Sequence, residues 1–219
     1  MSKGMAAVLI EHNFETAHRL PFLGGKCENL HGHSWKVSIA FVAYEHETGM
    51  DSRGISCEYG KLKQVVRTWI DDFLDHGCML GVKDPLLPVL LAEDSKVFVF
   101  GDVSWLAIAG EEQGHTSWTE PNASRVYEDM PWPTVEAVAR MLAERLQQRV
   151  DANFGDVLWI DRVVVTETAV NSAVWTPSGE EDDRRGRKLE LISGHDEYIG
   201  VLNANTPSAA GLRREDIHP

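Results

Sequence analysis

The sequence predicts an α+β fold, in which two amphipathic helices lie between an N-terminal and a C-terminal pair of strands. The first strand is expected over residues 6–17, where apolar and polar residues mix. The second is expected over 34–44, because apolar side chains alternate there as in a half-buried strand: Trp35, Val37, Ile39 and Phe41. Residues 162–168 form a β-branched run, and 172–176 are expected to form the last strand.

Two segments between these strand pairs have the apolar spacing of helices that bury one face. Residues 58–74 place an apolar stripe on one helix, formed by Leu62, Val65, Val66, Trp69, Ile70 and Phe73. Residues 134–150 repeat the pattern. Pro133 and Thr134 mark the start of this second helix, and Glu136 adds a carboxylate to its first turn.

The chain is predicted to form one domain over residues 6–177, with an insertion at about 84–132. The insertion is long for a connection between two helices, and it contains a strand-like piece at 96–100 and a polar stretch at 111–128. Residues 178–219 are expected to be a charged, loop-rich C-terminal extension, whose opening charged run is a solvated loop.

Composition and charge narrow the functional classes. The formal net charge of −13 argues against a nucleic-acid surface, which needs a surplus of Lys and Arg, but it allows a small phosphorylated substrate. No apolar run approaches the roughly 20 residues of a transmembrane helix. Residues 1–8 do not resemble a signal peptide, so a cytoplasmic protein is expected. The three cysteines, Cys27, Cys57 and Cys78, are then expected to be reduced thiols.

The segment from Cys27 to His33 holds the strongest chemical signal. His31 and His33 are two residues apart, so on a strand their imidazoles project from the same face. With His18 as a third ligand and an open fourth position, they would form a catalytic zinc site. The alternative is three histidines without a metal. Cys27 could close the zinc sphere as a structural ligand, or act as a base or nucleophile through a thiolate near a cation.

Two further groups carry carboxylates in chemically suggestive places. Asp75 precedes His76 just after the first predicted helix, where it could orient the ring, although a polar helix end is the simpler interpretation. Glu167 ends the β-branched run, as an exposed strand end or as an anchor for paired N–H donors of a ligand. Cys57 and Cys78 are interpreted as packing residues. The remaining histidines are interpreted as surface residues: His12, His46, His115, His195 and His218.

Five short segments, taken in order, resemble the 6-pyruvoyl-tetrahydropterin synthase family and its 6-carboxytetrahydropterin synthase branch. They are 14–20 (FETAHRL), 26–33 (KCENLHGH), 74–76 (LDH), 133–136 (PTVE) and 165–168 (VTET). In the pyruvoyl branch the cysteine usually stands further from the His-x-His pair. Three residues separate Cys27 from His31 here, as in the carboxy branch that feeds 7-deazaguanine (queuosine-type) synthesis. The spacing favours the carboxy branch.

The resemblance implies the tunnelling fold: a four-stranded antiparallel sheet with two helices on one face. Subunits of this family join their sheets into a barrel, as trimers that pair into hexamers, with active sites between subunits. The substrate implied is 7,8-dihydroneopterin triphosphate, and the carboxy branch releases acetaldehyde as well as triphosphate. The runner-up activities are triphosphate elimination alone, giving 6-pyruvoyl-tetrahydropterin, and non-catalytic binding of zinc or pterin.

The resemblance also assigns roles to particular residues. It implies zinc on His18, His31 and His33, a proton-transferring Cys27, and an Asp75–His76 pair as the partner acid and base. Glu167 would hold the pterin ring, with Thr134 nearby. The chain departs from the family at 54–59, where Glu58 stands in place of Asp and Ser56-Cys57 in place of apolar residues. The departure puts packing and a substrate contact there in question.

Overall fold

A computed structural model describes residues 6–43, 48–104 and 125–177. The predicted strand pairs form β1 (Ala7–His18) with β2 (His31–Ala43), and β6 (Leu158–Thr168) with β7 (Asn171–Trp175). These four strands are adjacent in the order β1-β2-β6-β7, and each neighbouring pair is antiparallel. The expected four-stranded antiparallel sheet is therefore present. β2 begins earlier than predicted, so both histidines of the His-x-His pair lie on it.

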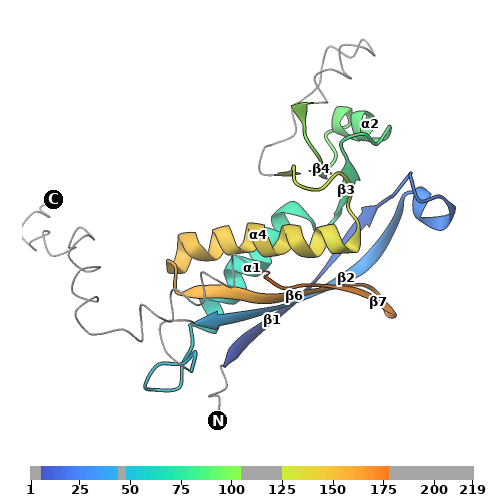
Figure 1. Cartoon of the computed structure of the whole chain (residues 1–219). Helices are drawn as coiled ribbons and strands as arrows, with labels where there is room; N and C mark the ends of the chain where they lie inside the picture. The colour runs from blue at the N-terminus through green and yellow to red at the C-terminus, as the bar shows by residue number, and fades with distance from the viewer. Residues whose placement is uncertain (1–5, 44–47, 105–124, 178–219) are drawn as a thin grey trace, which may run out of the picture.

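Two helices, α1 (Tyr59–Phe73) and α4 (Val135–Phe154), cover one face of this sheet, as predicted (Figure 1). Thr134 begins α4 as its N-cap, because its hydroxyl accepts a hydrogen bond from Ala137 N at 3.2 Å. The helices and the sheet enclose the main hydrophobic core, with Phe14, Trp35, Val163 and Leu142 fully buried in it. Burying such side chains is the main source of stability, at about 1.5–3 kcal/mol each.

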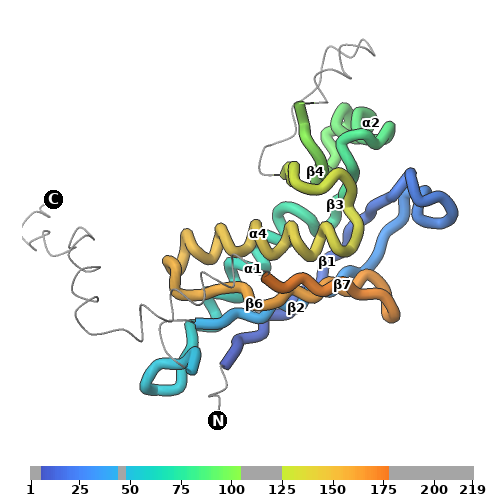
Figure 2. Tube along the Cα trace, viewed as in Figure 1, coloured from blue at the N-terminus to red at the C-terminus, as the bar shows by residue number. Residues whose placement is uncertain are grey.

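The chain between α1 and α4 adds further strands to the sheet (Figure 2). β3 (Gly77–Gly81), α2 (Leu87–Ala92), β4 (Val97–Phe100) and β5 (Val126–Tyr127) follow α1 in the chain. β3 lies parallel to the end of β1, and β4 and β5 add in parallel beyond it, which gives a seven-stranded mixed sheet. The strand-like piece predicted at 96–100 is β4, whereas β3 and β5 were not predicted.

This extension has a small hydrophobic core of its own. One face of β3 and β4 contributes Met79, Phe98 and Phe100 to the main core. The opposite face packs under α2 as a second cluster of buried side chains: Cys78, Leu80, Val82, Leu87, Val97, Val99 and Val126. Strands buried on both faces are typical of parallel sheet. The described residues of the predicted insertion, together with β3 before it, thus pack into the same sheet as the antiparallel strands.

No helix in the described residues combines the length and the apolarity needed to cross a membrane. The polar stretch predicted at 111–128 lies mostly outside the described residues, and the C-terminal extension 178–219 lies outside them entirely.

Candidate metal centre

The three predicted zinc ligands converge where β1 ends and β2 begins. His18 is paired with His31 in the register of these antiparallel strands, and His33 follows two residues later on the same face. One ligand atom from each of the three side chains lies within 4.8 Å of the others. The ring centroids of His18 are 4.7 Å from His31 and 5.3 Å from His33. The strand register alone therefore assembles the cluster.

Backbone carbonyls orient two of these rings. His18 Nδ1 lies 3.0 Å from the carbonyl oxygen of Pro133, just before α4, and His31 Nδ1 lies 2.8 Å from the carbonyl oxygen of Asn29. A carbonyl only accepts hydrogen bonds, so each Nδ1 must carry the proton and each Nε2 keeps a free lone pair. This tautomer is the one in which a histidine binds metal through Nε2.

The Nε2 atoms of His18 and His33 are buried and have no hydrogen-bond partner in the described part of the chain. A buried polar atom without a partner costs about 1–3 kcal/mol, so such atoms call for an explanation. Bound zinc would remove the cost at both atoms. The donor set and its geometry therefore fit a metal ion.

The electrostatics also suit a metal ligand. Burial lowers the pKa of His18 to about 4, although the Pro133 carbonyl opposes the shift, and the neighbouring His31 and His33 lower it further. Burial likewise lowers the pKa of His33, against the charge of Glu167. Both rings are therefore neutral near pH 7, and only a neutral imidazole can bind a metal. Trp35, two residues after His33, forms the buried floor of the cluster, with its ring centroid 4.9 Å from that of His18.

Glu167 is brought to this cluster by the end of β6. Its Oε1 lies 3.3 Å from His18 Nε2 and 3.8 Å from His33 Nε2, without hydrogen-bond geometry. Its side chain is 18% exposed. A carboxylate therefore faces the candidate metal position and can still meet a ligand entering from solvent.

Cys27 lies on the loop that joins the two ligand-bearing strands. It belongs to the short 3₁₀ helix η1 (Gly25–Glu28), and its carbonyl accepts a hydrogen bond from Leu20 N at 2.7 Å. This bond closes the loop two residues after His18. The thiol forms no disulfide and is partly buried.

Asp75 and His76 form a hydrogen-bonded pair beside β1. Asp75 Oδ2 lies 2.6 Å from His76 Nδ1, and Asp75 Oδ1 accepts a hydrogen bond from Glu15 N at 2.7 Å. Burial alone would raise the pKa of Asp75, but hydrogen bonds from Glu15 and His76 and the charge of Lys96 hold it below its usual value. The His76 ring is 81% exposed. The pair sits level with Glu15, three residues before His18, so it lies near the histidine cluster without joining it.

The other predicted residues have simpler surroundings. Thr134 caps α4, and a substrate contact there stays a prediction. Cys78 is buried in the small core, and Cys57 packs against the main core. His12 is not a free surface residue, because its side chain is only 15% exposed and its Nε2 lies 2.7 Å from Asp71. The remaining predicted surface histidines, His46, His115, His195 and His218, lie outside the described residues.

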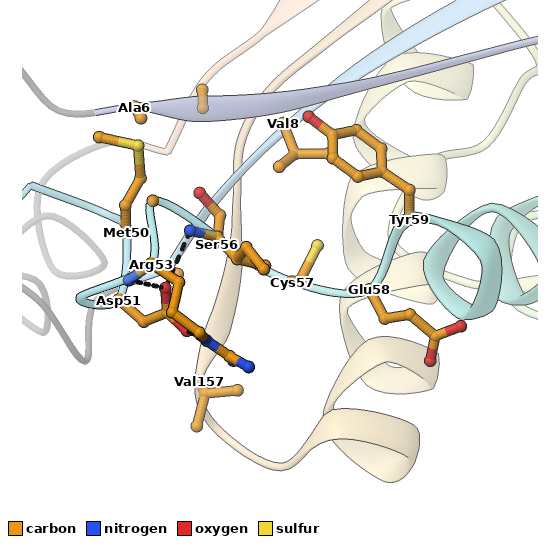
Figure 3. A pocket seen from close by; sticks show the side chains of 14 residues that line it. Ala6, Val8, Met50, Asp51, Arg53, Ser56, Cys57, Glu58, Tyr59 and Val157 are labelled. Carbon is orange, nitrogen blue, oxygen red and sulfur yellow. Dashed lines mark hydrogen bonds and ion pairs between the residues drawn. The ribbon is translucent and has the colours of Figure 1, made fainter.

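A separate cavity of about 740 Å³ lies near the start of β1 (Figure 3). The segment that departs from the family pattern lines it, including Cys57 and Glu58. β1 runs from this cavity to His18, and its length of 12 residues corresponds to about 35–40 Å. The cavity and the histidine cluster of one chain are therefore well apart.

Several contacts of the site were not predicted. The carbonyls of Pro133 and Asn29 carry no side-chain signal, because any residue offers a backbone carbonyl. Trp35 could have been found, since strand alternation places it on the face of His31 and His33. Arg19, next to His18, has its Nε 3.1 Å from Oδ2 of the fully buried Asp84 in the inserted segment, a contact between residues distant in sequence.

The antiparallel sheet, its two helices and the histidine cluster define a tunnelling-fold protein with a three-histidine centre suited to a metal. Residues 7–178 match the family described as 6-pyruvoyl tetrahydropterin synthase, and the chain belongs to that family. The expected fold is thereby confirmed.

Curated relatives carry the name of the carboxy branch. A 6-carboxy-5,6,7,8-tetrahydropterin synthase of Rickettsia felis is 34% identical over 71 residues, which are 32% of this chain and 49% of the relative. One of Synechocystis is 31% identical over 85 residues, which are 37% of this chain and 66% of the relative. The chain thus spans about half the length of the Rickettsia relative that it matches.

A solved structure of an uncharacterized protein from Wolinella succinogenes superposes with a TM-score of 0.51 at 22% identity. The match covers 79% of this chain and 98% of that one, and it bears on the fold alone.

Proposed function

We propose that this protein is a zinc-dependent lyase that converts 7,8-dihydroneopterin triphosphate and one water molecule to 6-carboxy-5,6,7,8-tetrahydropterin, acetaldehyde and triphosphate. The observation that carries the proposal is the histidine cluster, whose ligand atoms lie within 4.8 Å of one another and in which the Nε2 atoms of His18 and His33 are buried without hydrogen-bond partners in the described residues. The names of the curated relatives support the carboxy product. Zinc held by His18, His31 and His33 would bind the side-chain hydroxyls of the substrate and acidify the neighbouring C–H bonds.

The residues around the cluster are assigned proton transfer and binding of the pterin ring. Cys27, on the loop joining the ligand strands, would accept the proton released from the side chain of the substrate. Glu167 would accept N–H donors from the pterin ring, because its carboxylate lies at the cluster and keeps an exposed edge. Asp75 would orient the His76 ring through their 2.6 Å contact, so that His76 donates or accepts the second proton.

We further propose that the complete site forms between subunits of a homo-oligomer. The exposed His76 ring and the distance between the histidine cluster and the 740 Å³ cavity support this arrangement. Residues 54–59 of one chain are too far from the histidine cluster of that chain to share a site with it. They could only join the histidine cluster of another copy of the chain.

The deciding experiment is a metal assay paired with product analysis of the purified protein. We expect about one zinc per chain, and acetaldehyde and triphosphate in equal amounts from the dihydropterin triphosphate. Triphosphate without acetaldehyde would instead identify a 6-pyruvoyl-tetrahydropterin synthase. A folded, zinc-loaded sample without turnover would identify a binding protein.

Two substitutions separate the roles within the site. Cys27→Ala should abolish turnover and leave the zinc content near that of the wild type, because the thiol is assigned to proton transfer. His31→Ala should lower the zinc content itself, because a ligand is lost. Loss of zinc in Cys27→Ala would show that the thiol is a ligand and would overturn its assigned role.

A further inference from the structure

Lys96, the residue before β4 in the inserted segment, contacts the end of α1 and the turn that follows it. Its Nζ donates to the carbonyl oxygens of Asp71 at 2.6 Å and of Asp75 at 2.7 Å. The last carbonyls of a helix have no partner within the helix and carry its negative end, so an ammonium group stabilises them well. Here one of the two carbonyls belongs to the Asp75–His76 pair itself.

The main chain of Lys96 holds the other side of the same turn. Its carbonyl oxygen accepts a hydrogen bond from Cys78 N at 3.0 Å. A Cβ added to Gly77 would come within 2.8 Å of that oxygen, so the residue after His76 has to be small. Lys96 therefore fixes the chain on both sides of His76, through its ammonium group before the histidine and its carbonyl after it.

The turn needs such support because His76 is in a strained conformation. Its φ is 55°, in the left-handed region that glycine usually occupies at a helix end. A non-glycine residue there costs about 1–3 kcal/mol and persists only where the surroundings hold it. One hold comes from β1, since Glu15 O accepts from His76 N at 2.7 Å. The other comes from Lys96.

We propose that Lys96 is a positioning residue for the Asp75–His76 pair, by which the inserted segment sets the direction of the histidine ring. The inference rests on the proposed function for its catalytic consequence, whereas the geometry it describes can be measured without turnover. The Lys96 ammonium group donates to the backbone carbonyl of Asp75, so it holds the turn through the main chain, and its charge also helps to lower the pKa of the Asp75 carboxyl. The other charged groups nearby already have partners: Asp71 faces His12, and Glu15 accepts from Ser34 Oγ at 2.7 Å.

The test compares Lys96→Met, which keeps the length of the side chain without its N–H donors, with Lys63→Met on an exposed position of α1. Lys96→Gln is a second variant, to be used if Lys96→Met folds poorly. Its side chain has lost the positive charge but still carries N–H donors. Hydrogen exchange of the backbone over residues 74–78 should be at least tenfold faster in Lys96→Met and unchanged in Lys63→Met. The ¹⁵N spectrum of the His76 ring should lose the pure Nδ1–H tautomer that the contact with Asp75 favours.

With substrate, kcat of Lys96→Met should fall by about tenfold or more, while KM and zinc content stay within twofold. Lys96→Arg should recover part of kcat. Unchanged exchange and an unchanged ring tautomer in Lys96→Met would overturn the proposal, whatever the substrate proves to be. A wild-type protein without turnover would overturn the proposed function, and the exchange and tautomer measurements would still decide the role of Lys96.

Discussion

The antiparallel part of the sheet and its parallel extension contribute to the site in different ways. The antiparallel strands carry the three histidines and Glu167, and they place these side chains through strand register over a large apolar core. The extension carries none of these groups among the described residues. It reaches the site through charged side chains, with Asp84 against Arg19 and Lys96 against the turn of Asp75. The histidine cluster is therefore placed by the core, and the turn of the Asp75–His76 pair is held by the insertion as well as by β1.

The largest expected effect concerns His76, at the junction of the two regions. His76→Gly should lower turnover by about 10²–10⁴-fold, because the proposed function assigns this ring the part of a general acid or base. It should also raise the free energy of unfolding by about 1 kcal/mol, because glycine accepts the left-handed backbone without strain. Steady-state kinetics and urea unfolding measure the two effects.

His76→Ala is the matched control for this substitution. It removes the imidazole and keeps the backbone strain, so it should lose activity without gaining stability. Full activity in either variant would remove His76 from the mechanism and leave its strained backbone without a functional reason.

The core and the extension also differ in how far the sequence predicts them. The strand alternation from Trp35 to Phe41 and the apolar stripes of α1 and α4 are long enough to show their period, so these elements were predicted to within a few residues. β5 spans only two residues, and β3 has no β-branched or aromatic side chain to mark it as a strand, whereas β4, which is shorter than β3, consists of such residues throughout. The left-handed backbone conformation of His76 could not be predicted either, because glycine or asparagine usually occupies such a position at a helix end.

The site was predictable where side chains carry the chemistry, and hidden where the backbone does. The His-x-His spacing and the ordered motifs pointed to His18, His31, His33 and Glu167, which the structure brings together. The carbonyls of Pro133 and Asn29 orient the rings, but only the folded chain reveals them. The contacts of Asp84 and Lys96 depend on where the extension packs, which no local pattern encodes.

The second prediction tests how strongly the extension is joined to the core. Arg19→Ala should destabilise the protein by about 3–5 kcal/mol, because it leaves the fully buried carboxylate of Asp84 without its cation. The double variant Arg19→Ala/Asp84→Ala should cost less than Arg19→Ala alone. Urea unfolding of the two single variants and the double variant gives the coupling energy.

The zinc content provides a control for this cycle. It should remain near the wild-type value in the double variant if the core alone fixes the metal position. A strictly additive cycle would mean that the Arg19–Asp84 pair contributes no coupling energy, and the extension would then be joined to the core by strand pairing, the contacts of Lys96 and apolar packing.

The third prediction is that protonation of His18 accounts for most of the loss of stability of the metal-free protein in acid. The pKa of His18 in the folded state is about 4, below the value of about 6.5 for a free histidine. The unfolded chain therefore binds more protons than the folded protein between these pH values. The contribution of neutral His18 to the stability of the folded protein is complete above pH 6.5 and is lost as the pH falls toward 4. The expected loss is about 2–3 kcal/mol.

Urea unfolding of metal-free protein between pH 7 and 4.5 measures this loss. His18→Leu removes the titrating ring and should flatten most of the slope, whereas His12→Gln, at a pair outside the cluster, should leave it in place. Stability that is independent of pH over this range in the wild type would show that His18 does not titrate as its burial requires.

The smallest expected effect compares the two helices of the core. α4 has its N-cap hydroxyl in place, whereas Glu58 at the N-cap of α1 makes no capping hydrogen bond with its side chain. Aspartate is one methylene shorter and caps well, so Glu58→Asp should stabilise the protein by about 0.5–1 kcal/mol. Glu58→Gln, which keeps the length, is the control and should bring no gain.

Glu58 also lines the 740 Å³ cavity, far along β1 from the histidine cluster. A gain in stability with unchanged kcat and KM would show that this departure from the family pattern affects the helix alone. A change in KM of severalfold would instead make Glu58 part of the substrate site, which would then have to extend from the histidine cluster of one chain to the cavity of another.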